Sequence, residues 1–333
     1  MTHTLRPILE LIDEELALDG VTVRRRPIVA AERFVSGFVL EVRMSDGTTG
    51  KPGLPSDFVS QPWFQAVYAE VEEWYVERYG VRTRSGAKQA FRGVTFVAST
   101  SFEIHVPTSI TRPGKPGASV WLSFPDRVLP EDNPLEWLVA APNWESYSPD
   151  AIDNAVSTAA EVSELLRRIS SRLVGTQLAD QTARQLLAGI RIHLNSACSL
   201  ILAEDYEGSF ARAQWELQMA CEVAFKGLLQ QRTGSFPESH DLFHLHDRAS
   251  LFAQAINREW IRSLPRWNEA ANLRYGLGGH PSTTEIFDWY SATLRIIAGV
   301  CTGLQAYDLS RAEFEIGKAP WLGPPQPTRS IPE

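Results

Sequence analysis

An arginine and a histidine near the C-terminal end of the chain have the types and spacing that metal-free RNA cleavage requires. Arg274 and His280 are separated by five residues, three of which are glycines. Attack of a 2′-hydroxyl on the adjacent phosphate needs a proton acceptor, a proton donor for the leaving 5′-oxygen and positive charge beside the phosphorane. Histidine exchanges protons near neutral pH, and arginine grips two phosphate oxygens at once. We interpret Arg274 and His280 as candidate catalytic residues.

The residues around His280 favour a phosphate site. Residues 282–285, Ser-Thr-Thr-Glu, fit a capping box that starts a helix at Ser282. A helix N-terminus attracts phosphate and disfavours imidazolium, which suits His280 to the role of base. Gly279 and the glycines just before it permit close backbone approach to a ligand.

The elements that must position this pair follow one another in a recognisable order. A long helix is predicted over residues 209–233, with an Ala-x-x-x-Ala pattern and with Glu222 and Lys226 four residues apart; the turn His240-Asp241-Leu242 follows. With the Arg-x5-His element, this succession resembles the HEPN domain, an all-helical family of prokaryotic toxins, abortive-infection proteins and CRISPR-associated nucleases.

The resemblance covers roughly residues 180–310 and does not reach the N-terminal half. It implies a helical bundle that forms a homodimer through its last helices. Two Arg-x4–6-His elements would then line one cleft and cut RNA without a metal or other cofactor. Tyr275, Gly279, Ser282 and His193 would support the catalytic pair.

Structural interpretations of the same residues remain open. The residue after the family's arginine is often small or polar in nucleases, whereas here it is Tyr275, and an Arg-Tyr pair also occurs in members not known to cut RNA. Residues 274–280 could therefore form a structural or degenerate site in an interhelical loop. His193 lies among Ile190, Ile192 and Leu194, a setting typical of a core histidine with a satisfied hydrogen bond.

A cluster of histidines further upstream invites a metal interpretation, which we disfavour. His240 and His244 fall on one helical face, but no Glu follows in the His-Glu-x-x-His manner, and His246 is turned away. Helix capping and dimer contacts are the favoured roles. We predict no metal and no cofactor.

A run of cations marks the N-terminal half. Five basic residues occur within fifteen positions without an acidic residue: Arg78, Arg82, Arg84, Lys88 and Arg92. With Tyr79 and Phe91 nearby, this run could bind a nucleic-acid backbone or another anion. A solvated loop is the alternative interpretation.

The two halves of the chain differ in their patterns. Residues 1–150 contain strand patterns at 37–43, 94–97, 101–106 and 119–124, and a helical pattern at 57–79. Residues 151–317 predict helices at about 152–175, 176–203, 209–233, 239–263, 266–275 and 282–309. The fold class expected is an α+β N-terminal domain followed by an all-α, HEPN-like bundle with a proline-rich tail at 318–333.

Composition limits the classes of function. The 333 residues carry a formal net charge of −8, which excludes attachment to nucleic acid by bulk charge alone. No apolar window is long enough for a membrane span, residues 1–19 lack the basic start and apolar core of a signal peptide, and the three cysteines predict buried thiols. We expect a cytoplasmic protein.

The leading hypothesis is therefore a metal-independent endoribonuclease with the setting of a toxin or antiphage effector. Its expected partners are an RNA substrate, a second copy of the chain, and a regulatory protein or ligand that acts on the N-terminal domain; no membrane partner is expected. The alternative is a non-catalytic module that dimerises or binds a nucleotide or partner.

Overall fold

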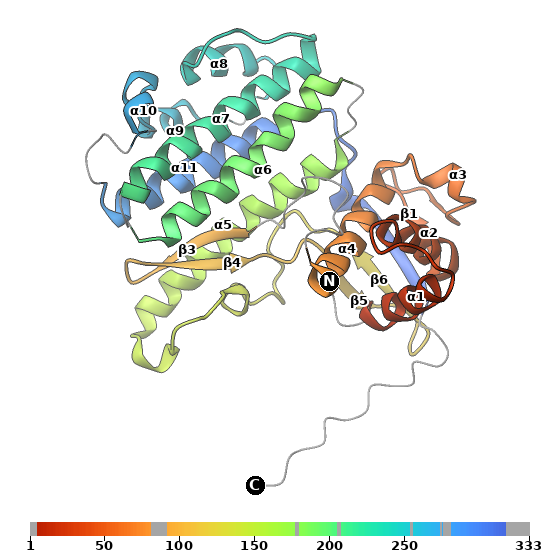
Figure 1. Cartoon of the computed structure of the whole chain (residues 1–333). Coiled ribbons are helices and arrows are strands. Elements are labelled where there is room, and N and C mark those ends of the chain that lie inside the picture. Colours follow the sequence, from red (N-terminus) through yellow and green to blue (C-terminus); the bar gives the residue numbers. More distant parts are fainter. Residues whose placement is uncertain are drawn as a thin grey trace. The chain divides into compact units, whose positions relative to one another are not determined.

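The fold is mixed α+β with a helical part, which confirms the sequence expectation at that level (Figure 1). The computed structural model describes residues 5–80, 92–176, 180–204, 208–253, 256–273, 275 and 281–317. These residues divide into two compact units. The first takes its residues from 1–86, 109–124 and 308–333, and the second from 87–108 and 125–307.

The first unit packs helices against an antiparallel sheet. Its helices are α1 (Arg6–Leu18), α2 (Arg26–Phe38), α3 (Pro55–Phe58) and α4 (Pro62–Tyr79). The sheet has the order β2-β1-β7-β6-β5, with bounds Thr49–Gly50, Val39–Arg43, Glu313–Gly317, Ser119–Ser123 and Ile110–Pro113. Trp63 of α4 packs on Phe314 of β7 with ring centroids 5.5 Å apart. This contact packs α4 on the central strand of the sheet.

Strand β7 explains why the units do not follow the boundary predicted near residue 150. It pairs Phe314 with Val42 of β1 and with Leu122 of β6, so residues close to the C-terminus complete the N-terminal sheet. A short 3-10 helix (Leu309–Arg311) leads into it. The predicted helix over 282–309 is accordingly shorter, and residues 318–333 lie outside the described part of the chain.

The second unit is built on four long helices: α5 (Pro149–Gly175), α6 (Gln181–Leu202), α7 (Ser209–Thr233) and α11 (Thr283–Thr302). Helix α7 packs against both α6 and α11, and α11 also packs against α5 (Figure 1). The predicted bounds of α7 are confirmed. Its C-terminus is set by Gly234, whose φ of 76° is the left-handed conformation that ends helices.

A β-hairpin belongs to this helical unit. Strands β3 (Arg92–Val97) and β4 (Thr100–His105) pack against α5 and α6. Gly93 makes the close approach possible, because a Cβ there would lie 2.5 Å from Leu166 of α5. The next residue, Val94, donates its N–H to the buried hydroxyl of Tyr290 on α11 at 3.2 Å.

Arg167 of α5 holds the chain where it leaves the second unit after residue 108 and where it returns at residue 125. Its guanidinium donates to the carbonyl oxygens of Pro107 at 2.9 Å and Arg127 at 2.8 Å, and to Asp132 at 2.5 Å. A buried cation is stable only with such partners. Arg167 therefore fixes the chain both where it leaves the second unit and where it returns. Two 3-10 turns follow, at Pro134–Trp137 and Trp144–Ser146.

Three short helices, α8 (Leu242–Ala249), α9 (Arg258–Ser263) and α10 (Trp267–Leu273), lie between α7 and α11 in the sequence. The sequence predicts one helix over 239–263, but the structure has two helices there, each with its own cap. Asp241 accepts from the N–H of Phe243 at 2.9 Å and starts α8, and Asn257 starts α9 in the same way. Helices α8 and α10 both pack on α7.

One described helix, α6, is long and apolar enough to cross a membrane by length and composition alone. It packs against α7 and the hairpin. A single such helix is weak evidence for a membrane protein, because core helices of soluble proteins meet the same criterion.

Candidate functional site

The described residues frame the Arg274–His280 segment at both ends. Leu273, the last residue of α10, is buried against Ala211 and Trp215 of α7. Arg274, Gly279 and His280 themselves lie outside the described residues. Tyr275 is described and is 72% exposed, and its N–H donates to the carbonyl oxygen of Asn272 at 3.1 Å.

The predicted capping box at the start of α11 is confirmed. The hydroxyl of Ser282 accepts from the N–H of Glu285 at 3.3 Å, and the Ser282 N–H donates to the Glu285 carboxylate at 2.8 Å. The Ser282 N–H and hydroxyl lower the pKa of Glu285, because they stabilise its charged form. The position two residues after His280 is thus the N-terminus of a capped, twenty-residue helix.

A buried carboxylate, a lysine and a histidine meet beside α10. Glu222 in the middle of α7 is 3% exposed and accepts from Lys226, one turn later, at 2.8 Å. The Nδ1 atom of His240 lies 3.0 and 3.1 Å from the two oxygens of the same carboxylate. His240 immediately precedes the cap of α8, so the end of the α7–α8 connection carries the histidine to this carboxylate.

An aromatic stack fixes the plane of the histidine. The His240 ring lies 4.1 Å from the ring of Trp267, with an interplanar angle of 9°. Trp267 is the first residue of α10 and also contacts Trp215 of α7, at 5.4 Å between centroids. Stacking and the hydrogen bond to Glu222 together restrain both torsions of the His240 side chain.

The arrangement is suited to proton transfer. An ionised carboxylate only accepts hydrogen bonds, so Nδ1 of His240 carries the hydrogen. The Nε2 atom is then the reactive nitrogen, on a side chain that is 48% exposed. A carboxylate that orients an imidazole and stabilises its charged form is the second half of a catalytic triad. The sequence contained both residues, but nothing in their spacing of 18 positions indicates contact.

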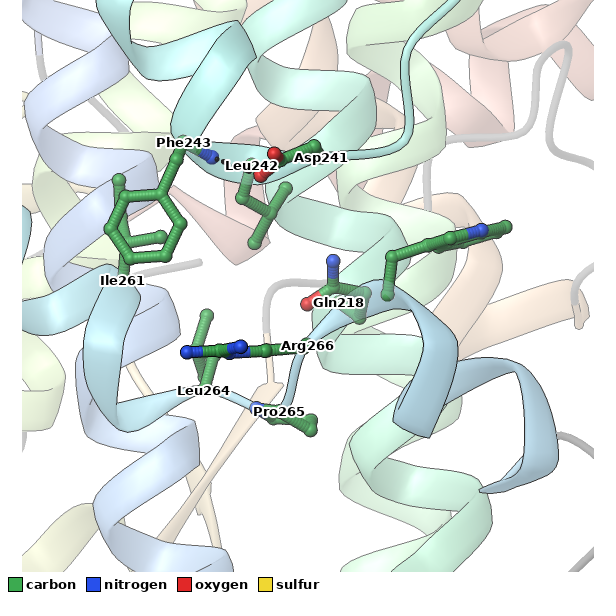
Figure 2. Close-up of a pocket in the computed structure, with 9 residues that line it drawn as sticks. Gln218, Asp241, Leu242, Phe243, Ile261, Leu264, Pro265 and Arg266 are labelled. Carbon is green, nitrogen blue, oxygen red and sulfur yellow. Dashed lines mark hydrogen bonds between the residues drawn. The ribbon is translucent and has the colours of Figure 1, made fainter.

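A cavity of about 380 Å³ adjoins this cluster (Figure 2). Helix α7 contributes Gln218, and the start of α8 contributes Asp241, Leu242 and Phe243. Helix α9 and the segment after it contribute Ile261, Leu264, Pro265 and Arg266, and α10 contributes Trp267. Trp267 therefore lines the cavity and stacks on His240. The volume falls within the range of small-molecule sites, about 300–1,000 Å³.

His193 and His246 have structural partners. His193 of α6 lies 2.7 Å from the carboxylate of Glu216 on α7, as a satisfied histidine between core helices would. His246 is buried and lies between Asp247 and the carbonyl oxygen of Ile256. Within the described ranges, no three histidine, cysteine or acidic side chains come together as metal ligands.

The two described ends of the basic run contact protein acceptors in different units. Arg78 of the first unit lies 3.6 Å from Asp13 and 3.8 Å from Glu10. Arg92 of the second unit donates to Glu103 and to the carbonyl oxygen of Asn195, both at 3.2 Å, and to the hydroxyl of Ser199. Arg82, Arg84 and Lys88 lie outside the described residues.

Comparisons of the chain with protein-family models, curated proteins and solved structures found no match.

Proposed function

We propose that the protein is a metal-independent endoribonuclease whose active site draws on the middle of α7, the start of α8, and α10 with the segment that follows it. The observation that supports this best is the Glu222–His240 pair, in which a buried carboxylate orients a half-exposed imidazole. Helix α10, whose first residue stacks on that imidazole, runs directly into Arg274. The HEPN resemblance indicates RNA as the substrate.

The proposed reaction uses two histidines and one arginine. His280 removes the proton of the 2′-hydroxyl, and the resulting oxygen attacks the adjacent phosphorus. Arg274 binds the phosphate oxygens that gain charge, and the P–O5′ bond breaks as His240 protonates the leaving oxygen. The products end in a 2′,3′-cyclic phosphate and a 5′-hydroxyl. The Glu222 carboxylate holds Nδ1 of His240 and leaves Nε2 free to deliver a proton, which suits this residue to the role of acid.

The biological setting is proposed from the resemblance. The enzyme acts in the cytoplasm as a homodimer formed through the helical unit, as a toxin or antiphage effector. The first unit then serves as the regulatory part, because an unregulated nuclease would harm its host. A net charge of −8 keeps background affinity for nucleic acid low and leaves binding to a local site.

The test is cleavage of total RNA in the presence of EDTA by the wild-type chain and four variants. We expect His280→Ala, Arg274→Ala and His240→Ala each to lose cleavage by about 100-fold or more. His244→Ala is the matched control, since His244 is an exposed histidine on α8; it should cleave like the wild type. Cleavage that persists in His280→Ala and Arg274→Ala, or that requires a metal, would contradict the proposal.

A non-catalytic nucleotide-binding module is the second candidate, favoured by the cavity beside Trp267. It predicts identical gel lanes with and without the wild-type protein, together with measurable binding of a nucleotide.

A further inference from the structure

The cavity contains a buried hydrogen-bond acceptor that the protein leaves unused. Gln218 is 1% exposed, and its Oε1 atom has no hydrogen-bond partner among the described residues. Most buried polar atoms in proteins are paired, so an unpaired amide oxygen at a cavity wall indicates a missing donor. Figure 2 shows the Gln218 side chain in the space between Leu242 and Arg266. A ligand with an N–H group would satisfy this oxygen.

A second acceptor lines the same cavity. Asp241 uses Oδ1 to cap α8 through the N–H of Phe243, but a carboxylate can accept several further hydrogen bonds. Two acceptors at one cavity fit a group that donates two hydrogens. An exocyclic amino group on a flat ring is such a group, whereas a carbonyl oxygen in its place would be repelled.

The remaining walls suit a planar heterocycle with a phosphate attached. Leu242, Ile261 and Leu264 are buried and apolar, and the rings of Phe243 and Trp267 offer stacking surfaces. Arg266 is exposed at the cavity and carries the cation that a phosphate requires. The cavity therefore combines stacking surfaces, two acceptors and one cation.

We propose that this cavity binds the adenine base of an unstacked nucleotide in the RNA substrate. The N6 amino group donates to Gln218 and Asp241, and the Gln218 amide N–H donates to the neighbouring ring nitrogen. Uracil would place a carbonyl oxygen against these acceptors. Adenine covers more of the apolar wall than cytosine does. That the adenine belongs to an RNA strand rests on the proposed function. Binding of this base then selects where the strand is cut.

The experiment compares two RNA oligomers that differ in one amino group. The first is an oligouridine with a single central adenosine, and the second carries purine riboside, which lacks the amine, at that position. Binding is measured by fluorescence anisotropy in EDTA with the His280→Ala chain, which leaves the strand uncut. We expect the adenosine oligomer to bind about tenfold more tightly, and Gln218→Met to abolish that preference. Gln214→Met is the matched control, because Gln214 is 4% exposed on the same helix and does not line the cavity.

Two results would overturn the inference: equal affinity of both oligomers, or a preference that survives in Gln218→Met. In a third possible result, the protein prefers adenosine monophosphate to purine riboside monophosphate and binds the two oligomers equally. That result would assign the cavity to a free nucleotide and overturn the inference that its ligand is RNA. Cleavage by the wild type without base preference would overturn this inference alone. Base preference without cleavage would overturn the proposed function alone.

Discussion

Each unit contains a buried carboxylate that is surrounded by hydrogen-bond donors. The two carboxylates differ in whether any of their partners can exchange a proton near neutral pH. Asp13 of α1 is 2% exposed and accepts from Arg26 at 3.1 Å and from the hydroxyl of Tyr79, while Arg78 lies 3.6 Å away. Burial and the Asp13 charge also raise the pKa of the adjacent Tyr75. All of these partners are groups that keep their protons at neutral pH.

Glu222 is equally buried, but one of its partners is an imidazole. Lys226 donates to the carboxylate at 2.8 Å, whereas His240 presents a second nitrogen on a half-exposed ring. A buried carboxylate whose partners are arginines and a phenol stabilises the fold, whereas one whose partner is an imidazole can take part in proton transfer. Burial of a carboxylate therefore identifies a candidate site only when at least one of its hydrogen-bond partners can gain or lose a proton near neutral pH.

The largest expected effect is on folding, at Asp13. Asp13→Ala leaves the guanidinium of Arg26, whose side chain is 13% exposed, without its carboxylate. Breaking a buried pair on one side costs about 3–5 kcal/mol, so the free energy of unfolding should fall by that amount in urea titrations. RNA cleavage under native conditions should not change. A loss below about 1 kcal/mol would show that the Asp13 cluster is not a structural centre of the first unit.

The corresponding change at Glu222 should act on cleavage. Glu222→Gln removes the carboxylate that orients His240, and we expect the cleavage rate to fall about 100-fold, equivalent to about 2.7 kcal/mol. The variant also leaves Lys226 buried without a counter-charge, which lowers stability. The double variant Glu222→Gln/Lys226→Met removes that penalty. It should regain stability in thermal unfolding and remain slow in cleavage, whereas recovery of both would mean that Glu222 has only a structural role.

Local patterns in the sequence were sufficient for the features that depend on neighbouring residues. The bounds of α7 and the capping box at Ser282 are set within a few positions of the chain, and both are confirmed. Strand β7 was not predicted, because five residues gain their strand character from β1 and β6, which lie far away in the sequence. The contact of Glu222 with His240 likewise depends on how the chain turns between α7 and α8.

The same limit explains what was missed at the site. Glu222 and His240 belong to one sequence pattern, but a sequence does not give the distance between a helix centre and the following turn. Gln218 carries no motif and becomes informative only because its oxygen is buried at a cavity without a partner. The basic run differs from Gln218 because it has a clear sequence pattern. Its described ends, Arg78 and Arg92, nevertheless contact acceptors in separate units.

Buried thiols without a counter-charge should lower the stability of the fold at high pH, whereas carboxylates that are charged in the fold lower it at low pH. Cys198, Cys221 and Cys301 of the second unit are free and buried, and burial raises the pKa of each thiol to about 12. Because the folded pKa exceeds the unfolded value of about 9, their contribution is complete below pH 9 and is lost as the pH rises toward 12.

Near pH 10, one such thiol should cost about 1.4 kcal/mol relative to pH 7. Urea unfolding of the wild type and of Cys221→Ala over pH 7 to 10.5 measures this contribution. The variant should lose less stability with pH than the wild type. Parallel pH profiles would show that the Cys221 thiol is not shielded from solvent in the folded state.

The smallest effect is expected at a third carboxylate, Glu285, which is exposed and held only by local hydrogen bonds. Ser282→Ala removes the cap of α11 and should lower the free energy of unfolding by about 1 kcal/mol at pH 7. Folding lowers the pKa of Glu285. The contribution of this carboxylate to the free energy of unfolding is therefore present above pH 4.5 and is lost as the pH falls through the lowered pKa.

Ser148→Ala is the matched control for that change. Ser148 caps α5 by accepting from the N–H of Ala151 at 3.3 Å, and Ala151 has no carboxylate to return the hydrogen bond. Its cost should therefore vary less between pH 7 and pH 3 than the cost of Ser282→Ala. Equal pH dependence in the two variants would mean that the Glu285 hydrogen bond to Ser282 contributes nothing. A carboxylate with only local partners would then differ from Asp13 and Glu222 in kind as well as in size.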